Sequence, residues 1–251
     1  MKLDDVKKLH QKKYRARFGH YLVEGEHLIL ELQKALILQP NTSAIKVYVT
    51  AEYQAWATRL SSVFEIHPVS DKHMAQLTDT KSPQGIIACV PLPELAQKAN
   101  TKSEEHAQVE RCIYLHEVQD PGNLGTILRT LAWFGGFRLL LSSNSVDPFN
   151  SKVVRSSMGA IFHVPIELDV ELSELQTRFN NFAYLDMQGK PVNSLEFADY
   201  DCYLFGNEAR GVPLDALTKC NAQAFTIPGN GSIDSLNLAS AVNMCMYQLS
   251  V

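Results

Sequence analysis

The sequence predicts an α/β protein with a small N-terminal domain and a larger C-terminal domain that contains a parallel sheet. Short apolar runs rich in β-forming residues alternate with helical patterns along most of the chain. A polar stretch with two prolines, Pro91 to Glu110, interrupts this alternation in the way that an interdomain linker does. Near the C-terminus, two apolar runs each end at a glycine-containing loop, which is typical of strands in a parallel sheet.

The length of 251 residues fits two domains. We place the N-terminal domain at 1–91, the linker at 92–110 and the C-terminal domain at 111–251. No apolar run reaches the ~20 residues that cross a bilayer, so no membrane association is expected. Five cysteines without a CxxC pair and a charged N-terminus without a signal peptide predict reduced thiols in a cytoplasmic protein.

Helices and short strands should alternate in the first domain. A basic helix ends near Gly19, and Ser70 is the expected N-cap of a helix over 71–77. The other expected elements are strands at 21–23, 45–50, 65–67 and 85–90 and helices at 27–36 and 52–60. This alternation predicts a compact α/β unit.

Positive charge gathers at the N-terminus although the net charge of the chain is −4. Seven lysines and arginines stand against two aspartates in the first twenty residues. Such an arm either contacts nucleic-acid phosphates or forms a solvated helix face. The candidate phosphate contacts are Lys12, Lys13, Arg15, Arg17 and, farther along the chain, Arg155.

The second domain should begin with a strand at 112–116 and a helix that has Asp120 as its N-cap. Ile127, Leu128 and Leu131 give this helix an apolar stripe. Arg129 therefore points away from most of that stripe, and Asn123 lies in the first turn. The later expected elements are strands at 137–141, 161–166, 182–186, 203–205 and 224–227, a short helix after the turn at 147–150, and helices at 171–179 and from Ser235 onward.

Glycine-containing loops follow the last two of these strands. The loop at 206–211 carries one carboxylate, Glu208, and the loop at 228–231 precedes the helix expected at Ser235. We expect the two strands to end side by side and to form a crevice at the carboxyl ends of the sheet. For either loop alone, an ordinary strand-to-helix turn is the alternative.

Several common enzyme classes are disfavoured. The motifs GxGxxG, GxxxxGK[ST], GxSxG and HExxH are absent, which argues against Rossmann dehydrogenases, P-loop NTPases, serine hydrolases and zinc peptidases. The histidines are scattered, and no metal site is expected. What remains is a polar set on predicted loops, Asn123, Arg129, Glu208, Ser235 and Asn237. The alternative is that these residues are helix caps and an ordinary ion pair between Arg129 and Glu208.

Three segments of the second domain resemble the motifs of the SpoU/TrmH branch of the SPOUT RNA 2′-O-methyltransferases, in the same order and spacing. They are Asp-Pro-Gly-Asn-Leu-Gly-Thr-Ile-Leu-Arg at 120–129, Gly-Asn-Glu-Ala-Arg-Gly at 206–211, and Ile-Pro-Gly-Asn-Gly followed by Ser-Leu-Asn-Leu-Ala at 227–239. Residues 15–36 look like part of the small ribosomal-protein-like domain that binds the RNA substrate in many such enzymes.

The resemblance implies a C-terminal segment threaded into a deep trefoil knot and a homodimer formed through the C-terminal domain. It also implies S-adenosylmethionine as the methyl donor, without a metal. The cofactor-binding residues would be Leu204, Gly206, Asn207, Ile227, Pro228, Leu236 and Asn237.

The reaction implied is methyl transfer to a ribose 2′-hydroxyl, with Arg129, Asn123, Glu208, Ser235 and Asn237 as catalytic residues. Arg129 would act on the hydroxyl or bind the adjacent phosphate, because a guanidinium with a pKa above 12 is an awkward base. The chain stops at Val251 without the basic extension common in members that act on tRNA, which favours large-subunit ribosomal RNA. A tRNA 2′-O-methyltransferase, an enzyme that methylates a base nitrogen and a non-catalytic RNA-binding dimer are the alternatives. Removing residues 1–90 is expected to spare the fold and abolish RNA methylation.

Overall fold

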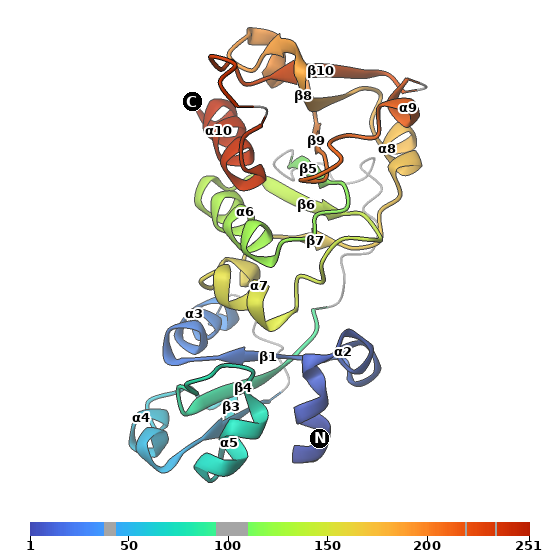
Figure 1. Ribbon diagram of the computed structural model, residues 1–251. Coiled ribbons are helices and arrows are strands. Elements are labelled where there is room, and N and C mark those ends of the chain that lie inside the picture. The colour runs from blue at the N-terminus through green and yellow to red at the C-terminus, as the bar shows by residue number, and fades with distance from the viewer. Residues whose placement is uncertain (38–43, 94–109, 219, 234) are drawn as a thin grey trace. The chain divides into compact units, whose positions relative to one another are not determined.

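The computed structural model describes residues 1–37, 44–93, 110–218, 220–233 and 235–251 (Figure 1). Contacts divide the chain into two compact units. The first is Met1–Pro93 with Asp147–His163, and the second is Glu94–Val146 with Val164–Val251. Most of the predicted linker, 94–109, lies outside the described residues.

The first unit contains a mixed sheet in the order β1-β4-β2-β3, counting the described residues. Its strands are β1 (His20–Glu24), β2 (Ile45–Val49), β3 (Phe64–Pro68) and β4 (Ile86–Pro91). Strand β4 runs antiparallel to both β1 and β2, whereas β2 and β3 are parallel. The predicted strands are therefore present, and the chain order did not indicate how they pair.

Short helices surround this sheet. They are α1 (Leu3–Val6), η1 (Lys7–His10), α2 (Lys12–Phe18), α3 (Glu26–Ile37), η2 (Ala51–Tyr53), α4 (Gln54–Ala57) and α5 (Asp71–Leu77). Helix α2 ends at Gly19, which has a φ of 65° that glycine adopts without strain. The Ser70 side chain accepts a hydrogen bond from the His73 amide at 3.3 Å and caps α5, as predicted. The helix expected at 52–60 is instead split into η2 and α4.

Residues Asp147–His163 belong with the first unit although they follow β6 (Phe137–Leu141) of the second. They contain α7 (Ser151–Ser156) and η3 (Ala160–Phe162). The ring of Phe149 is buried and lies 5.0 Å from that of Tyr21. A truncation at residue 90 would expose this packing surface, which argues against the expectation that it spares the fold.

The prediction of a strand at 161–166 is wrong for most of that range. Residues 160–162 form η3, and only Ile166–Glu167 forms a strand, β7. Pro165 stands directly before β7. Because proline has no backbone N–H to donate, it disfavours a strand through this position.

The second unit contains a sheet in which every pairing is parallel, as predicted, with the order β10-β8-β9-β5-β6-β7 in the described residues (Figure 1). The strands not yet given are β5 (Arg111–Leu115), β8 (Phe182–Pro191), β9 (Cys202–Phe205) and β10 (Ala222–Thr226). Its helices are α6 (Pro121–Phe134), α8 (Leu172–Arg178), η4 (Leu195–Asp199), α9 (Leu214–Leu217) and α10 (Leu238–Ser250). No helix in the described part of the chain is long and apolar enough to span a bilayer.

The two strands before the glycine-containing loops are not neighbours, contrary to the sequence prediction. Strand β8 lies between β9 and β10, and β9 pairs on its other side with β5. The carboxyl ends of β5 and β9 therefore meet, and the loops at 116–120 and 206–211 follow them. Helix α10, which packs against α6, brings the end of the second loop toward the same region.

Helix α10 also begins later than predicted. Its N-cap is Asn237, whose side chain accepts a hydrogen bond from the Ser240 amide at 3.2 Å. Ser235 lies before the helix. An asparagine cap satisfies a first-turn amide that would otherwise have no partner.

Candidate active site

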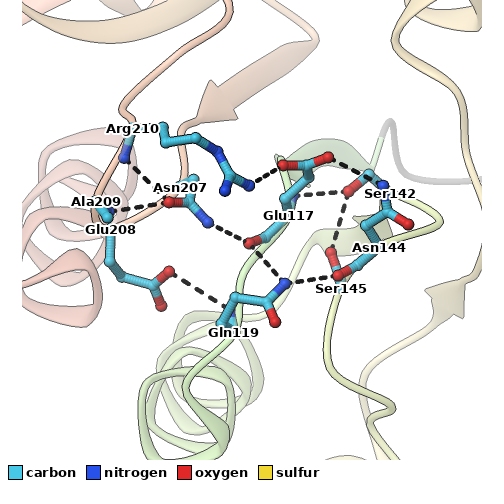
Figure 2. A network of polar contacts seen from close by, with 9 residues as sticks. All are labelled: Glu117, Gln119, Ser142, Asn144, Ser145, Asn207, Glu208, Ala209 and Arg210. Atoms are coloured by element: carbon cyan, nitrogen blue, oxygen red, sulfur yellow. Dashed lines mark hydrogen bonds and ion pairs between the residues drawn. The ribbon is translucent and has the colours of Figure 1, made fainter.

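The loop at 206–211 is closed on itself at the end of β9. Asn207 and Gly211 exchange backbone hydrogen bonds of 2.9 and 2.8 Å. Asn207 is only 6% exposed, and its side-chain oxygen accepts from the amides of Ala209 and Arg210 at 2.9 and 3.0 Å. Its side-chain nitrogen donates to the Glu117 carbonyl at 2.7 Å, which fastens the loop to the end of β5 (Figure 2).

Glu208 projects from this loop toward the start of α6. Its carboxylate accepts hydrogen bonds from the backbone amides of Gln119 and Asp120 at 3.4 and 3.5 Å. The side-chain nitrogen of Asn123 donates to the same carboxylate at 3.3 Å. A carboxylate at this position is favoured by the partial positive charge of the helix N-terminus.

Asn237 completes a chain of polar side chains. Its side-chain nitrogen donates to the Asn123 oxygen at 2.9 Å, and Asn123 donates in turn to Glu208. Asn123 lies in the first turn of α6, Glu208 in the loop after β9, and Asn237 at the N-cap of α10, three segments that are far apart in the sequence. The structure therefore brings together three of the five predicted catalytic residues.

Arg129 and Ser235 do not join this chain. Both are exposed, and neither side chain has a hydrogen-bond or ion-pair partner among the described residues. The contacts of Glu208 are with loop amides and Asn123, so the alternative of an ordinary Arg129–Glu208 ion pair is not found in the described part of the chain.

The predicted cofactor residues occupy the ends of β9 and β10 and the start of α10. Leu204 is buried in β9, and Gly206 and Asn207 open the first loop. Ile227 is half-buried directly after β10, and Pro228 beside it is exposed. Leu236, next to Asn237, is 43% exposed, which is unusual for a leucine and leaves apolar surface at this edge.

The prediction that Arg15 contacts phosphate is wrong. Its side chain is 4% exposed, and its guanidinium donates to Asp147 at 2.5 Å and to the carbonyls of Leu9 and His10 at 2.8 and 2.9 Å. These contacts occupy the guanidinium inside the first unit and leave it no face for a nucleic acid. Arg155 is partly exposed and pairs with Asp79 at 2.5 Å.

Lys12, Lys13 and Arg17 are exposed on α2, and we call these three residues the basic face. The ammonium group of Lys13 lies 4.8 Å from the centre of the Tyr14 ring, and the guanidinium carbon of Arg17 lies 5.6 Å from that of Phe18. Cations interleaved with aromatic rings suit a nucleic-acid surface.

Glu117 is the residue that sequence reasoning missed. It stands two residues after the end of β5 and has a left-handed backbone with φ of 51°, a conformation that a sequence pattern does not reveal for glutamate. Hydrogen bonds from Asn144 and Arg210 lower the pKa of its carboxyl group. Burial lowers the pKa of the preceding His116, whose ring stacks on Tyr114 at 6.2 Å.

The described part of the chain contains no cluster of side chains that could hold a metal ion. Within the residues that the structure describes, no group of three or more histidine, cysteine, aspartate or glutamate side chains is arranged to hold an ion. The site is instead a set of amides, carboxylates and backbone groups around two loops.

Comparison with known proteins gives consistent matches over both units. Residues 110–247 match the SpoU rRNA Methylase family, and residues 2–88 match the MRM3-like substrate binding domain. The 23S rRNA (guanosine(2553)-2'-O)-methyltransferase RlmP of Bacillus subtilis (strain 168) is 30% identical, covering 99% of this chain and 95% of that protein. The rRNA methyltransferase 3, mitochondrial, of Xenopus laevis is also 30% identical, over 94% of this chain and 70% of its own length. The solved structure of an AdoMet-bound rRNA methyltransferase from Sinorhizobium meliloti superposes with a TM-score of 0.78 at 25% identity, covering 98% of this chain and 93% of that chain.

Proposed function

The chain belongs to the SpoU rRNA methylase family, and from this premise we propose that it transfers a methyl group from S-adenosylmethionine to a ribose 2′-hydroxyl of RNA. The observation that carries the proposal is the chain of hydrogen bonds from Asn237 through Asn123 to Glu208. It joins the three sequence segments of the predicted reaction centre at the carboxyl ends of the parallel strands. Open α/β sheets bind their ligands at these ends of the strands.

S-adenosylmethionine fits the chemistry of the residues present. The exposed Leu236 and the half-buried Ile227 offer apolar contact to an adenosine, and the backbone of the loop at 206–211 offers hydrogen bonds. Gly206 keeps that backbone free of a side chain. When bound, the cofactor supplies an electrophilic methyl group, so no metal is needed to activate it.

The residues of the chain would position the acceptor. Asn123 and Asn237 orient the ribose by hydrogen bonds, and Glu208 fixes the amide of Asn123. Much of the acceleration would come from alignment of the hydroxyl with the methyl group. Arg129 would approach the hydroxyl or the neighbouring phosphate once the RNA is bound.

Large-subunit ribosomal RNA is the substrate that we favour over tRNA. The Bacillus subtilis relative, which aligns over nearly the whole chain, is a 23S rRNA 2′-O-methyltransferase by name. The match of residues 2–88 to a substrate binding domain supports RNA recognition by the first unit. A cytoplasmic location stays a prediction from the sequence, and the trefoil knot stays a prediction from the family resemblance.

Transfer of a labelled methyl group tests the proposed function. Ribosomal RNA from a strain that lacks the gene is incubated with the protein and labelled S-adenosylmethionine, and the labelled nucleotide is mapped. We expect one nucleotide that resists alkaline cleavage, because a 2′-O-methyl group removes the hydroxyl that attacks the phosphate. Label on a base, or on tRNA and not on ribosomal RNA, would contradict the proposed atom or the proposed substrate.

The basic face should supply part of the RNA affinity. Replacing Lys12, Lys13 and Arg17 together with alanine should weaken RNA binding and lower the slope of log affinity against log salt by about one unit per lost phosphate contact. The affinity is measured by titration at several salt concentrations. The control replaces three exposed basic residues of the same unit, Arg59, Lys72 and Lys81, and should keep the wild-type slope. Equal slopes for the two triple variants would contradict the assignment of the basic face.

We also propose that the protein forms a homodimer through α6 and α10. These helices pack together, yet three of their large apolar residues are exposed to solvent. The exposed fraction is 85% for Trp133, 47% for Met244 and 59% for Tyr247. Apolar side chains of this size gathered on a packed helix pair are typical of a protein interface. A second copy is the proposed occupant, because a two-fold axis allows one self-complementary face to bury itself.

A charge on this face should separate the subunits. Trp133→Glu is expected to yield monomers in analytical ultracentrifugation. The monomer should still be folded and show a thermal unfolding transition, because the side chain is not part of the core. Leu195→Glu is the control, since Leu195 is 94% exposed but lies on η4. A Trp133→Glu protein that sediments as the wild type would rule out this face as the interface.

A further inference from the structure

Glu117 adopts a backbone conformation that is unfavourable for its residue type. Its φ of 51° lies in the left-handed region, which few non-glycine residues enter. Such strain persists where the surrounding contacts hold the residue in place, and it gathers at functional sites. The contacts of Glu117 therefore indicate which function the strained conformation supports.

These contacts connect the ends of three strands. The Glu117 amide donates to the Ser142 hydroxyl at 2.7 Å, and the Asn144 side chain donates to its carboxylate at 3.0 Å (Figure 2). Both partners follow β6. The other carboxylate oxygen pairs with Arg210, and the Glu117 carbonyl accepts from Asn207, both in the loop after β9.

Glu208 stands between the two loop residues that Glu117 holds. Asn207 precedes it and Arg210 follows it by two positions, so the loop is fastened on both sides of the Glu208 carboxylate. The same carboxylate reaches the amides of Gln119 and Asp120 and the side chain of Asn123. A shift of this loop would move Glu208 away from the start of α6.

We propose that Glu117 is a positioning residue for the methyl transfer, which sets the loop at 206–211 so that Glu208 and Asn123 meet. This inference rests on the proposed function. Arg210 is 68% exposed on its side chain, so its ion pair with Glu117 adds little to stability. The effect of Glu117 should therefore appear in the geometry of the loop and in turnover, not in the melting temperature.

Glycine at position 117 separates these two effects. Glu117→Gly removes the side-chain contacts but also removes the backbone strain, so the melting temperature should stay level or rise. Turnover should nevertheless fall by roughly tenfold or more, because a displacement of about 1 Å at a reacting centre is costly. Hydrogen exchange of the Ala209 and Arg210 amides, which bind Asn207, should become faster.

Asp169 provides a matched control. It is exposed, lies in the same unit and has a φ of 55°, but it is not part of this network. Asp169→Gly should raise the melting temperature as well and leave turnover and loop exchange unchanged. Comparison of Glu117→Gly with Asp169→Gly therefore corrects for any general effect of placing glycine at a left-handed position.

Glu117→Gln and Arg210→Gln test the ion pair without changing the backbone. If the two residues act through their contact, the double variant should lose no more turnover than either single variant. Additive losses would show that they act separately and would overturn the role of the pair. Wild-type turnover and unchanged exchange in Glu117→Gly would overturn the inference altogether. If the wild type transfers no methyl group, the proposed function fails, and loop exchange alone still decides whether Glu117 holds the loop.

Discussion

Replacing Arg129 with alanine should lower kcat by about two to four orders of magnitude, the range found for groups that act on a proton in the transition state. The affinity for S-adenosylmethionine, measured by calorimetry, should change little. The melting temperature should also stay nearly constant, because the side chain is exposed and has no partner among the described residues. A large loss of turnover in a protein of normal stability cannot then be attributed to unfolding.

Lysine at this position is the sharper variant. It keeps the positive charge but loses the planar fork that binds a phosphate or hydroxyl through two donors. We expect Arg129→Lys to recover only part of the activity. Near-normal turnover of the lysine variant would show that charge alone suffices, and near-normal turnover of the alanine variant would remove Arg129 from the site. Arg59→Ala, at another exposed arginine, controls for the loss of one surface charge.

The position of Arg129 on α6 also suggests which subunit it serves. It lies six residues beyond Asn123, about 9 Å along the helix axis, and does not share a face with it. It does share a face with Trp133, four residues later, which belongs to the proposed dimer interface. In the proposed dimer, Arg129 of one subunit would therefore be directed toward the partner rather than toward its own Asn123.

Mixed dimers distinguish the two arrangements. Arg129→Ala and Asn123→Ala subunits, each expected to be inactive alone, are mixed, allowed to exchange and assayed. If each site takes Asn123 from one subunit and Arg129 from the other, an equal mixture should regain about a quarter of the wild-type activity, because half of the dimers contain one intact site. A mixture that stays inactive after exchange would show that both residues serve the same site within one subunit.

The sequence predicted local features well because they depend on neighbouring residues. The cap at Asp120, the end of α2 at Gly19 and the parallel pairing of the second sheet all follow from nearby side chains or from the alternation of elements. The motif spacing also indicated that Asn123, Glu208 and Asn237 would share a site, and they are hydrogen-bonded in series.

Features that depend on distant residues were not predictable in the same way. The position of β8 between β9 and β10 is a matter of long-range pairing, which strand patterns do not encode. Arg15 looked like a surface cation because its partner Asp147 stands 132 positions away in the chain. The role of Glu117 depends on a backbone angle that becomes visible only when the ends of β5, β6 and β9 are in place.

Alanine at Gly206 should disrupt the loop after β9 and, with it, cofactor binding. A Cβ atom at this position would lie 2.2 Å from the carbonyl carbon of Gly211 and 2.4 Å from the amide nitrogen of Val212. Both are backbone atoms, so no side chain can turn aside. The loop must open and lose the paired hydrogen bonds between Asn207 and Gly211.

The expected cost is about 1–3 kcal/mol of unfolding free energy, as in other overpacked positions. The affinity for S-adenosylmethionine should fall by roughly tenfold to a hundredfold, and calorimetry and thermal unfolding measure the two effects. Gly229→Ala is the matched control in the other glycine-containing loop, because a Cβ there meets nothing within 4 Å. The close approach at Gly206 predicts that the two alanine variants differ sharply. If Gly206→Ala binds the cofactor as tightly as Gly229→Ala does, the loop at 206–211 is not part of the cofactor site.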